Sequence, residues 1–89
     1  MSYTKHRSRW DILLDILKVI SEEEGVKKTR IMQKTNLDWR SFKKYFDFLV
    51  DHSFLRVGDE LGKRKSYKLT KNGRNLLVKL QEVTEMIQE

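Results

Sequence analysis

Apolar residues near the start of the chain recur at the spacing of a helix: Trp10, Leu13, Ile16, Leu17 and Ile20. The pattern predicts a helix from about Arg9 to Glu24 that buries one stripe. Ser8 can cap its first turn, with Asp11 at the third helical position, and Gly25 ends it. The glutamates at 22–24 sit at the unfavourable end of the helix dipole, so we expect them to serve solubility rather than to stabilise the fold.

The stretch Thr29–Ser53 combines a short helical period, a polar turn and a longer helical period. We expect a brief helix that Thr29 caps and that ends near Thr35. The tripeptide Asn36–Asp38 supplies two polar residues that favour turns and a leucine that can fill the gap between two helices. Asp38 can also cap the second helix. These are the requirements of a helix-turn-helix corner.

The second helix of this pair, from Asp38 to about Ser53, has an apolar and a polar side when residues are placed at about 100° intervals. Its apolar side carries Phe42, Tyr45, Phe46 and Leu49. Its polar side carries Arg40, Lys44, Asp47 and Asp51, with Trp39 and Lys43 at the boundary. The cations occupy the first half and the aspartates the second, which favours contact of the N-terminal half with phosphates and bases.

Alternating residues and turn formers over 54–69 predict a β-hairpin with its tip near Glu60–Lys63. Behind a helix-turn-helix, such a hairpin is a wing. Its return strand carries three consecutive cations, Lys63, Arg64 and Lys65. They either protect an exposed edge strand against aggregation or make a second contact with DNA.

A final helix is predicted from its cap, Thr70, to the end of the chain. Its apolar residues recur at heptad spacing: Leu76, Leu80, Val83 and Ile87. A helix of about 20 residues is about 30 Å long, which is longer than so small a domain can cover. We therefore expect this seam to form a homodimer, the alternative being that it packs on the first helix.

The length and the charge distribution narrow the picture. A chain of 89 residues forms one domain with one core. The net charge is −1 over residues 1–26, +9 over 27–75, which hold 14 basic and 5 acidic residues, and −2 over 76–89. The excess in the middle favours an acidic polymer as partner, and a merely solvated surface is the alternative.

Residue usage argues against several kinds of chemistry. The chain has no cysteine, and its two histidines, His6 and His52, are far apart, so we expect no disulfide, no metal and no cofactor. The first apolar run, Ile12–Ile20, is interrupted by charges and is too short for a signal peptide or a membrane span. We expect a cytoplasmic, nucleoid-associated protein. No nucleophile, base and orienting group emerge together, so we expect no enzyme.

Three segments resemble the small archaeal winged-helix DNA-binding proteins: KKTRIMQKTNLDW at 27–39, FLVDHSFLRV at 48–57 and YKLTKNGRNLL at 67–77. The sequence TRIM followed by NL is typical of that archaeal group, whereas LTxxGxxLL is shared by many winged-helix regulators. The similarity covers residues 10–89. It implies a mainly α winged helix-turn-helix fold with a small β-hairpin. In the dimeric chromatin-type members, a C-terminal helix forms an antiparallel coiled coil.

By position, the resemblance implies DNA contacts on three elements. The second helix of the pair would enter the major groove, the start of the first would meet phosphate, and the wing would reach the neighbouring backbone. The expected DNA-binding residues are Lys28, Thr29, Trp39, Arg40, Ser41, Lys43, Lys44, Lys63, Arg64 and Lys65. Trp39 is left open between packing and DNA contact.

These patterns together predict a flexible basic arm at 1–9, a winged helix-turn-helix DNA-binding domain at 10–69 and a dimerisation helix at 70–89. The expected function is binding of double-stranded DNA, as a transcription regulator or a nucleoid-associated protein. The alternative is a protein-interaction module of a transcription or repair complex, because winged helices also serve that purpose.

Overall fold

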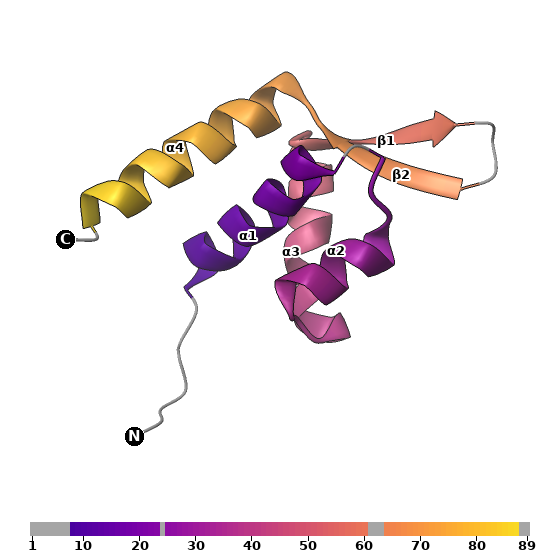
Figure 1. Cartoon of the computed structure of the whole chain (residues 1–89), viewed down its shortest axis with the longest axis horizontal. Helices are drawn as coiled ribbons and strands as arrows, with labels where there is room; N and C mark the ends of the chain where they lie inside the picture. Colours follow the sequence, from indigo (N-terminus) through magenta and orange to yellow (C-terminus); the bar gives the residue numbers. More distant parts are fainter. Residues whose placement is uncertain (1–7, 24, 61–63, 88–89) are drawn as a thin grey trace.

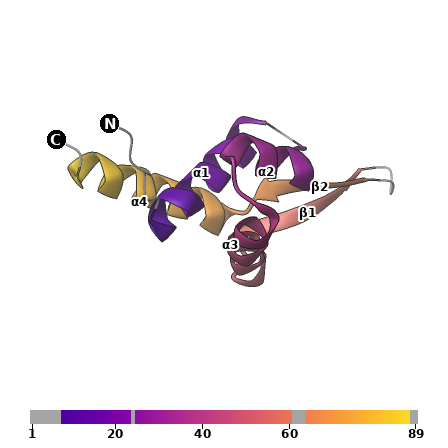
Figure 2. The same ribbon diagram turned by 90° about the horizontal axis from the view of Figure 1, so that it is seen from below.

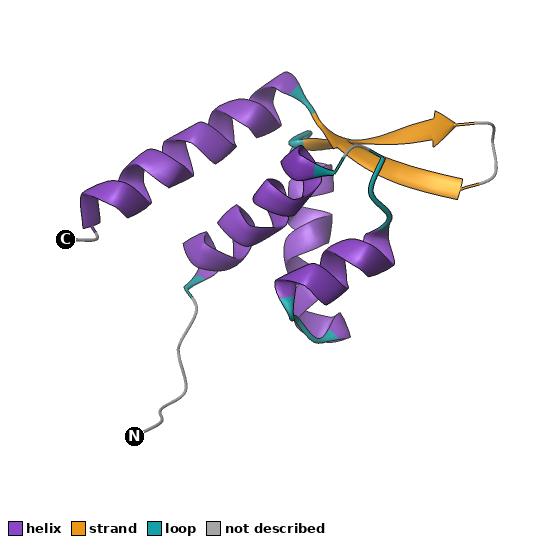
Figure 3. Cartoon of the chain, in the orientation of Figure 1, coloured by secondary structure: helices purple, strands orange, loops and turns teal. Residues whose placement is uncertain are grey.

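A computed structural model of the chain describes residues 8–23, 25–60 and 64–87. Three helices are followed by a two-stranded hairpin and a fourth helix, as predicted (Figure 1). The elements are α1 (Arg9–Glu22), α2 (Lys28–Thr35), α3 (Trp39–Asp51), β1 (Leu55–Glu60), β2 (Arg64–Leu69) and α4 (Lys71–Ile87). The fold is mainly α with one small hairpin, and Figure 3 shows how little of it is strand.

The cap predicted for α1 is confirmed. The Ser8 hydroxyl accepts a hydrogen bond from the Asp11 N–H at 3.1 Å, and the Asp11 carboxylate accepts one from the Ser8 N–H at 3.2 Å. The helix ends at Glu22, two residues earlier than predicted. The chain must leave the helix there because Val26 pairs with β2.

The predicted cap of α2 is wrong. Thr29 is the second residue of this helix, and the cap position is Lys27, whose side chain makes no capping bond. The Val26 carbonyl accepts the Tyr67 N–H at 3.0 Å, which holds the chain extended up to Lys27. The helix therefore starts at Lys28, one residue before its first hydroxyl side chain.

The turn between α2 and α3 has the predicted chemistry. Asn36 takes the left-handed conformation with φ of 57°, which asparagine tolerates better than most residues. The Asp38 side chain accepts the Ser41 N–H at 2.7 Å and so caps α3. This hydrogen bond lowers the pKa of Asp38, because it favours the ionised carboxylate. The helix ends at Asp51, two residues before the predicted Ser53.

The hairpin pairs β1 and β2 antiparallel, with Leu55 opposite Leu69 and Glu60 opposite Arg64. Its predicted tip includes residues 61–63, which lie outside the described residues. The isolated bridge from Val26 to Tyr67 adds a short third edge to the sheet. In Figure 1 the hairpin projects away from the helices, as a wing does.

The core lies where α1, α2 and α3 meet the base of the hairpin. Its fully buried side chains are Ile16, Leu17, Ile31, Phe42 and Leu49. Phe46 of α3 meets Tyr67 of β2 edge-on, with ring centres 4.8 Å apart, and this contact joins the helices to the wing. The apolar side predicted for α3 is therefore the side that faces the core.

Helix α4 runs antiparallel to α1 and beside it, as Figures 1 and 2 both show. Its predicted cap is confirmed, because the Thr70 hydroxyl accepts the Gly73 N–H at 3.0 Å. Leu80 packs in the core and Leu76 packs against it, whereas Val83 and Ile87 are 50% and 73% exposed. The predicted seam is thus divided between an inner half within the chain and an outer exposed half.

The described residues contain neither a membrane-spanning helix nor a cluster of metal ligands. No helix in that part of the chain is long and apolar enough to cross a membrane. Within the same residues, no three histidine or carboxylate side chains gather where they could hold a metal ion.

Candidate nucleic-acid interface

The outer side of α3 forms a shallow groove, which we call the α3 surface, lined by Trp39, Arg40, Lys43, Lys44 and Asp47. Four of these residues are among those that the sequence predicts to contact DNA. Three cations lie within two turns of one helix, and the Asp38 cap fixes where that helix begins. The surface is open and shallow, which suits contact with a polymer better than enclosure of a small ligand.

The three cations of the α3 surface differ in whether they form an ion pair within the described residues. Lys43 donates to Asp47 one turn later, at 2.7 Å between Nζ and Oδ2, and this bond raises the pKa of Lys43. Arg40 and Lys44 are exposed and form no ion pair with any residue that the structure describes. Arg40 and Lys44 are therefore the cations that an incoming anion meets without first breaking an ion pair.

Trp39 is partly packed and partly exposed. Its ring packs on Phe42, with centres 6.2 Å apart, yet 53% of the residue is exposed. The Lys28 ammonium lies 5.3 Å from the centre of the Trp39 ring and 5.1 Å from that of Phe46. This cation–π contact holds the start of α2 against the start of α3. The Lys28 ammonium thus faces aromatic rings. This position was not predicted from the sequence, from which a contact of Lys28 with a DNA phosphate is expected.

The other predicted site residues are more scattered. Thr29 is exposed at the start of α2, and Ser41 is half-buried, with its backbone N–H donated to Asp38. Lys63 lies outside the described residues. Arg64 and Lys65 begin β2, opposite Glu60 and Asp59 in the strand register. The structure therefore brings together Trp39, Arg40, Lys43 and Lys44, and leaves the wing as a separate element.

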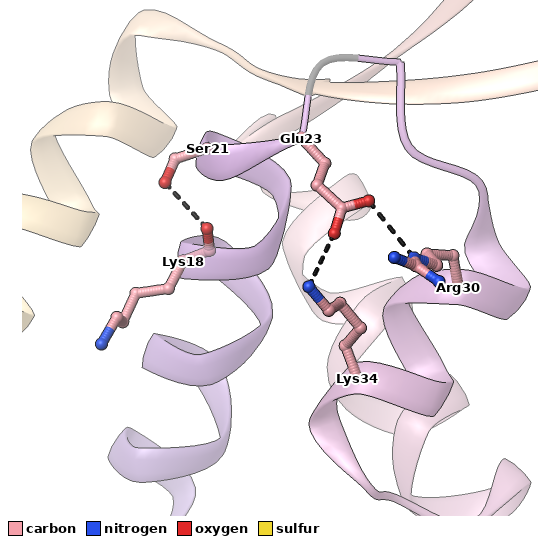
Figure 4. Close-up of polar contacts among 5 residues, drawn as sticks. All are labelled: Lys18, Ser21, Glu23, Arg30 and Lys34. Atoms are coloured by element: carbon pink, nitrogen blue, oxygen red, sulfur yellow. Dashed lines mark hydrogen bonds and ion pairs between the residues drawn. The ribbon is translucent and has the colours of Figure 1, made fainter.

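A contact between α1 and α2 was missed from the sequence. The Glu23 carboxylate accepts a hydrogen bond from Lys34 at 2.8 Å and from Arg30 at 3.3 Å, as Figure 4 shows. These bonds, that of Lys34 foremost, lower the pKa of Glu23. The expectation that the glutamates at 22–24 stabilise nothing is therefore wrong for Glu23. Its partners come from another helix, and sequence spacing gives no sign of such a contact.

Replacing Glu23 by glutamine should lower the stability of the protein at pH 7. A carboxylate whose pKa is lowered by folding stabilises the protein above its unfolded pKa, about 4.3 for glutamate, and loses this effect as the pH falls through the folded value. Thermal unfolding should therefore show a difference in Tm between Glu23→Gln and the native chain at pH 7 that narrows as the pH falls below the unfolded pKa. Glu22→Gln is the matched control, because Glu22 is exposed and forms no ion pair with a described residue. An equal loss in both variants would contradict the assigned role.

Three helices, a polar turn before a basic helix and a hairpin behind it define a winged helix-turn-helix domain. Residues 6–88 match the family described as winged helix-turn-helix, and the chain belongs to that family. The predicted fold class is therefore confirmed by both the structure and the family match.

Relatives of the chain occur in archaea. The uncharacterized protein MJ0287 of Methanocaldococcus jannaschii is 40% identical over 81 residues, which are 91% of this chain and 77% of that protein. MJ0290 of the same organism is also 40% identical over 81 residues, but the chain spans only 36% of its length. The structure of Sso10a-2, a DNA-binding protein from Sulfolobus solfataricus, matches with a TM-score of 0.75 at 28% identity, covering 90% of this chain and 81% of that chain. The predicted resemblance to archaeal winged-helix proteins is thus confirmed.

Proposed function

We propose that the protein binds double-stranded DNA through the α3 surface, as a transcription regulator or a nucleoid-associated protein. The observation that carries the proposal is the pair of exposed cations, Arg40 and Lys44, on the first half of a helix that projects beside a wing. Such a helix fits the major groove of B-DNA. The DNA-binding description of Sso10a-2 supports the same function.

In this proposal the cations of α3 have two roles: one contacts base edges and the others contact the phosphate backbone. Arg40 lies in the first turn, where recognition helices contact base edges, and its planar fork can pair with two guanine acceptors. Lys44 lies one turn later and acts as a point charge toward phosphate. Lys43 joins it once Asp47 releases the ammonium, and Thr29 and the basic return strand of the wing meet neighbouring phosphates.

A binding titration at two salt concentrations tests this function. If six to eight phosphates are neutralised per dimer, the slope of log K against log salt should be roughly −5 to −7. Random and selected duplexes measured in parallel separate general from sequence-specific binding, since only a base-reading protein prefers the selected one. A slope near zero would contradict DNA binding and favour the alternative, a protein-interaction module.

The exposed half of α4 is the dimerisation element in this proposal. Val83 and Ile87, together with Trp10 at the start of α1, line a groove of about 490 Å³. Met86 and Trp10 are 78% and 62% exposed, so the apolar end of α4 remains uncovered within one chain. A second copy that covers this groove across a two-fold axis would place two α3 helices for successive major grooves.

Replacing Ile87 by glutamate should convert the proposed dimer into a monomer. The change places a charge in the apolar interface, while the core of the single chain is untouched because Ile87 is 73% exposed. Sedimentation equilibrium should show about half the native mass, with unchanged helix content. Lys79→Glu, at an exposed position of the same helix, should leave the mass as it is. A monomeric native chain, or a dimeric Ile87→Glu variant, would contradict this role of α4.

A further inference from the structure

A second group of cations lies at the base of the hairpin, apart from the α3 surface. Arg56 of β1, Lys68 of β2 and Arg74 of α4 line one groove of about 430 Å³. Its accessible apolar wall is formed by Leu77 and Val78 of α4, and Val78 is 50% exposed. Figure 1 shows the end of α1 and the start of α4 meeting at this end of the strands. The cations come from three elements, so no sequence window contains them together.

The strand register places this groove away from α3. Lys68 is opposite Arg56, and its neighbour Tyr67 packs on Phe46 of α3. Successive side chains of a strand point to opposite faces of the sheet. Lys68 and Arg56 therefore project from the face opposite to Tyr67, and DNA on the α3 surface leaves this face uncovered.

The charges of the groove are not balanced by the described part of the chain. Two cations opposite each other in antiparallel strands repel and destabilise the hairpin. None of the three cations, Arg56, Lys68 and Arg74, forms an ion pair with any described residue. The Glu23 carboxylate at the end of α1 is turned toward α2, where Lys34 and Arg30 hold it, while Ser21 lies on the side of α4 (Figure 4). An anion that enters the groove relieves this repulsion.

We propose that this groove binds a small organic phosphate of the nucleotide class, that is, a phosphate ester carrying an apolar ring. Three cations suit a doubly charged phosphate, and the guanidinium groups of Arg56 and Arg74 can each donate two parallel hydrogen bonds to it. The apolar wall suits the ring. The volume lies within the range of about 300 to 1,000 Å³ of small-molecule sites.

The apolar wall distinguishes this ligand from a strand of DNA. A duplex presents its phosphates at the rim of the grooves and keeps its bases stacked inside, so it would meet the cations but leave the apolar side chains of Leu77 and Val78 uncovered. A free nucleotide uses both kinds of surface at once. The proposal is independent of the DNA-binding function, because none of its residues belongs to the α3 surface or to the three consecutive cations at 63–65 of the wing.

Titration of the ¹⁵N-labelled full chain with AMP, inorganic phosphate and adenosine at constant ionic strength tests the proposal. AMP should shift the amide signals of Arg56, Lys68 and Arg74 to saturation. Inorganic phosphate should bind the same residues about tenfold more weakly, because it cannot use the apolar wall. Adenosine should bind weakly, and its amide shift changes should not reach saturation, because it carries no charge that the cations can attract.

Two variants and a control give this test its specificity. Lys68→Gln and Arg74→Gln should each weaken AMP binding about tenfold, the loss of one charge-assisted contact. Lys68→Gln should also raise the Tm of the ligand-free chain, because it removes one of two opposed cations. The control is Lys79→Gln, an exposed position on α4 outside the groove, which should leave AMP binding unchanged.

Three results would overturn the proposal. Shifts that sodium chloride reproduces at equal ionic strength would show screening and not a site. AMP binding as weak as that of phosphate would remove the role of the apolar wall. A loss of duplex affinity in Lys68→Gln as large as its loss of AMP affinity would assign the cations to the DNA surface instead. Failure of duplex binding alone would leave the AMP measurement standing, so the two proposals are tested separately.

Discussion

Replacing Arg40 by alanine is expected to weaken binding to the preferred duplex by about 1 to 3 kcal/mol, or roughly 5- to 150-fold in Kd. Random duplexes should lose less, so the preference for the selected site should shrink. The reason is the position of Arg40 in the first turn of α3, exposed and without an ion pair among the described residues. The fold should be unaffected, since no core contact is removed.

Arg40→Lys is the matched control for this prediction. Lysine keeps the charge but lacks the planar fork that pairs with two acceptors of one base. It should therefore preserve affinity for random duplexes and lose preference for the selected one. Lys44→Ala should weaken all duplexes alike and reduce the salt slope by about one. Equal losses on every duplex for all three variants would show that the protein reads no base.

The elements that follow from periodicity were predictable from the sequence. The stripe of α1, the cap by Asp38 and the apolar side of α3 all depend on residues within one or two turns of each other. Helical spacing alone separates Phe42, Phe46 and Leu49, which are buried, from Arg40 and Lys44, which are exposed. Such local patterns carry most of the information about a helix that is amphipathic.

Features that depend on contacts between elements were not predictable. Nothing in the sequence indicates that the Lys28 ammonium lies over the rings of Trp39 and Phe46. Glu23 reads as a solubility residue, yet it joins α1 to α2. Thr29 reads as a cap, yet the pairing of Val26 with β2 moves the start of the helix. In each case a residue distant in sequence decides the outcome.

The same distinction holds for the seam of α4. Its heptad spacing correctly identifies an apolar side, but spacing does not say which half of that side the chain itself covers. The structure places Leu80 in the core and leaves Ile87 exposed. A substitution at Leu80 would therefore test folding, whereas one at Ile87 tests association.

Gly73→Ala is expected to destabilise the fold by about 3 kcal/mol, although helix propensity alone favours alanine by up to about 1 kcal/mol. Gly73 lies in the first turn of α4, where an added Cβ would stand 2.1 Å from the carbonyl oxygen of Phe54. That distance is far below a van der Waals contact, and the atom it meets is backbone.

The neighbouring hydrogen bonds prevent an easy adjustment. The Phe54 carbonyl accepts the Thr70 N–H at 3.0 Å, and the Phe54 N–H donates to Leu49 at 2.9 Å. The Thr70 hydroxyl donates to the Ser53 carbonyl at 2.6 Å and accepts the Gly73 N–H. Relief of the clash therefore requires α4 to move away from the base of the hairpin, and the bonds that cap α4 would be lost with it.

Thermal unfolding of Gly73→Ala beside Asn75→Ala decides between packing and propensity. Asn75 is exposed on the same helix, so its replacement should be neutral or slightly stabilising. Gly73→Ala should lower the Tm by roughly 10 to 20 °C. If both variants were equally stable, α4 would not approach Phe54 closely. The close contact with Phe54 would then not be the reason why the LTxxG segment has glycine at position 73. If only Gly73→Ala is destabilised, that segment marks the point where the fourth helix docks on the wing.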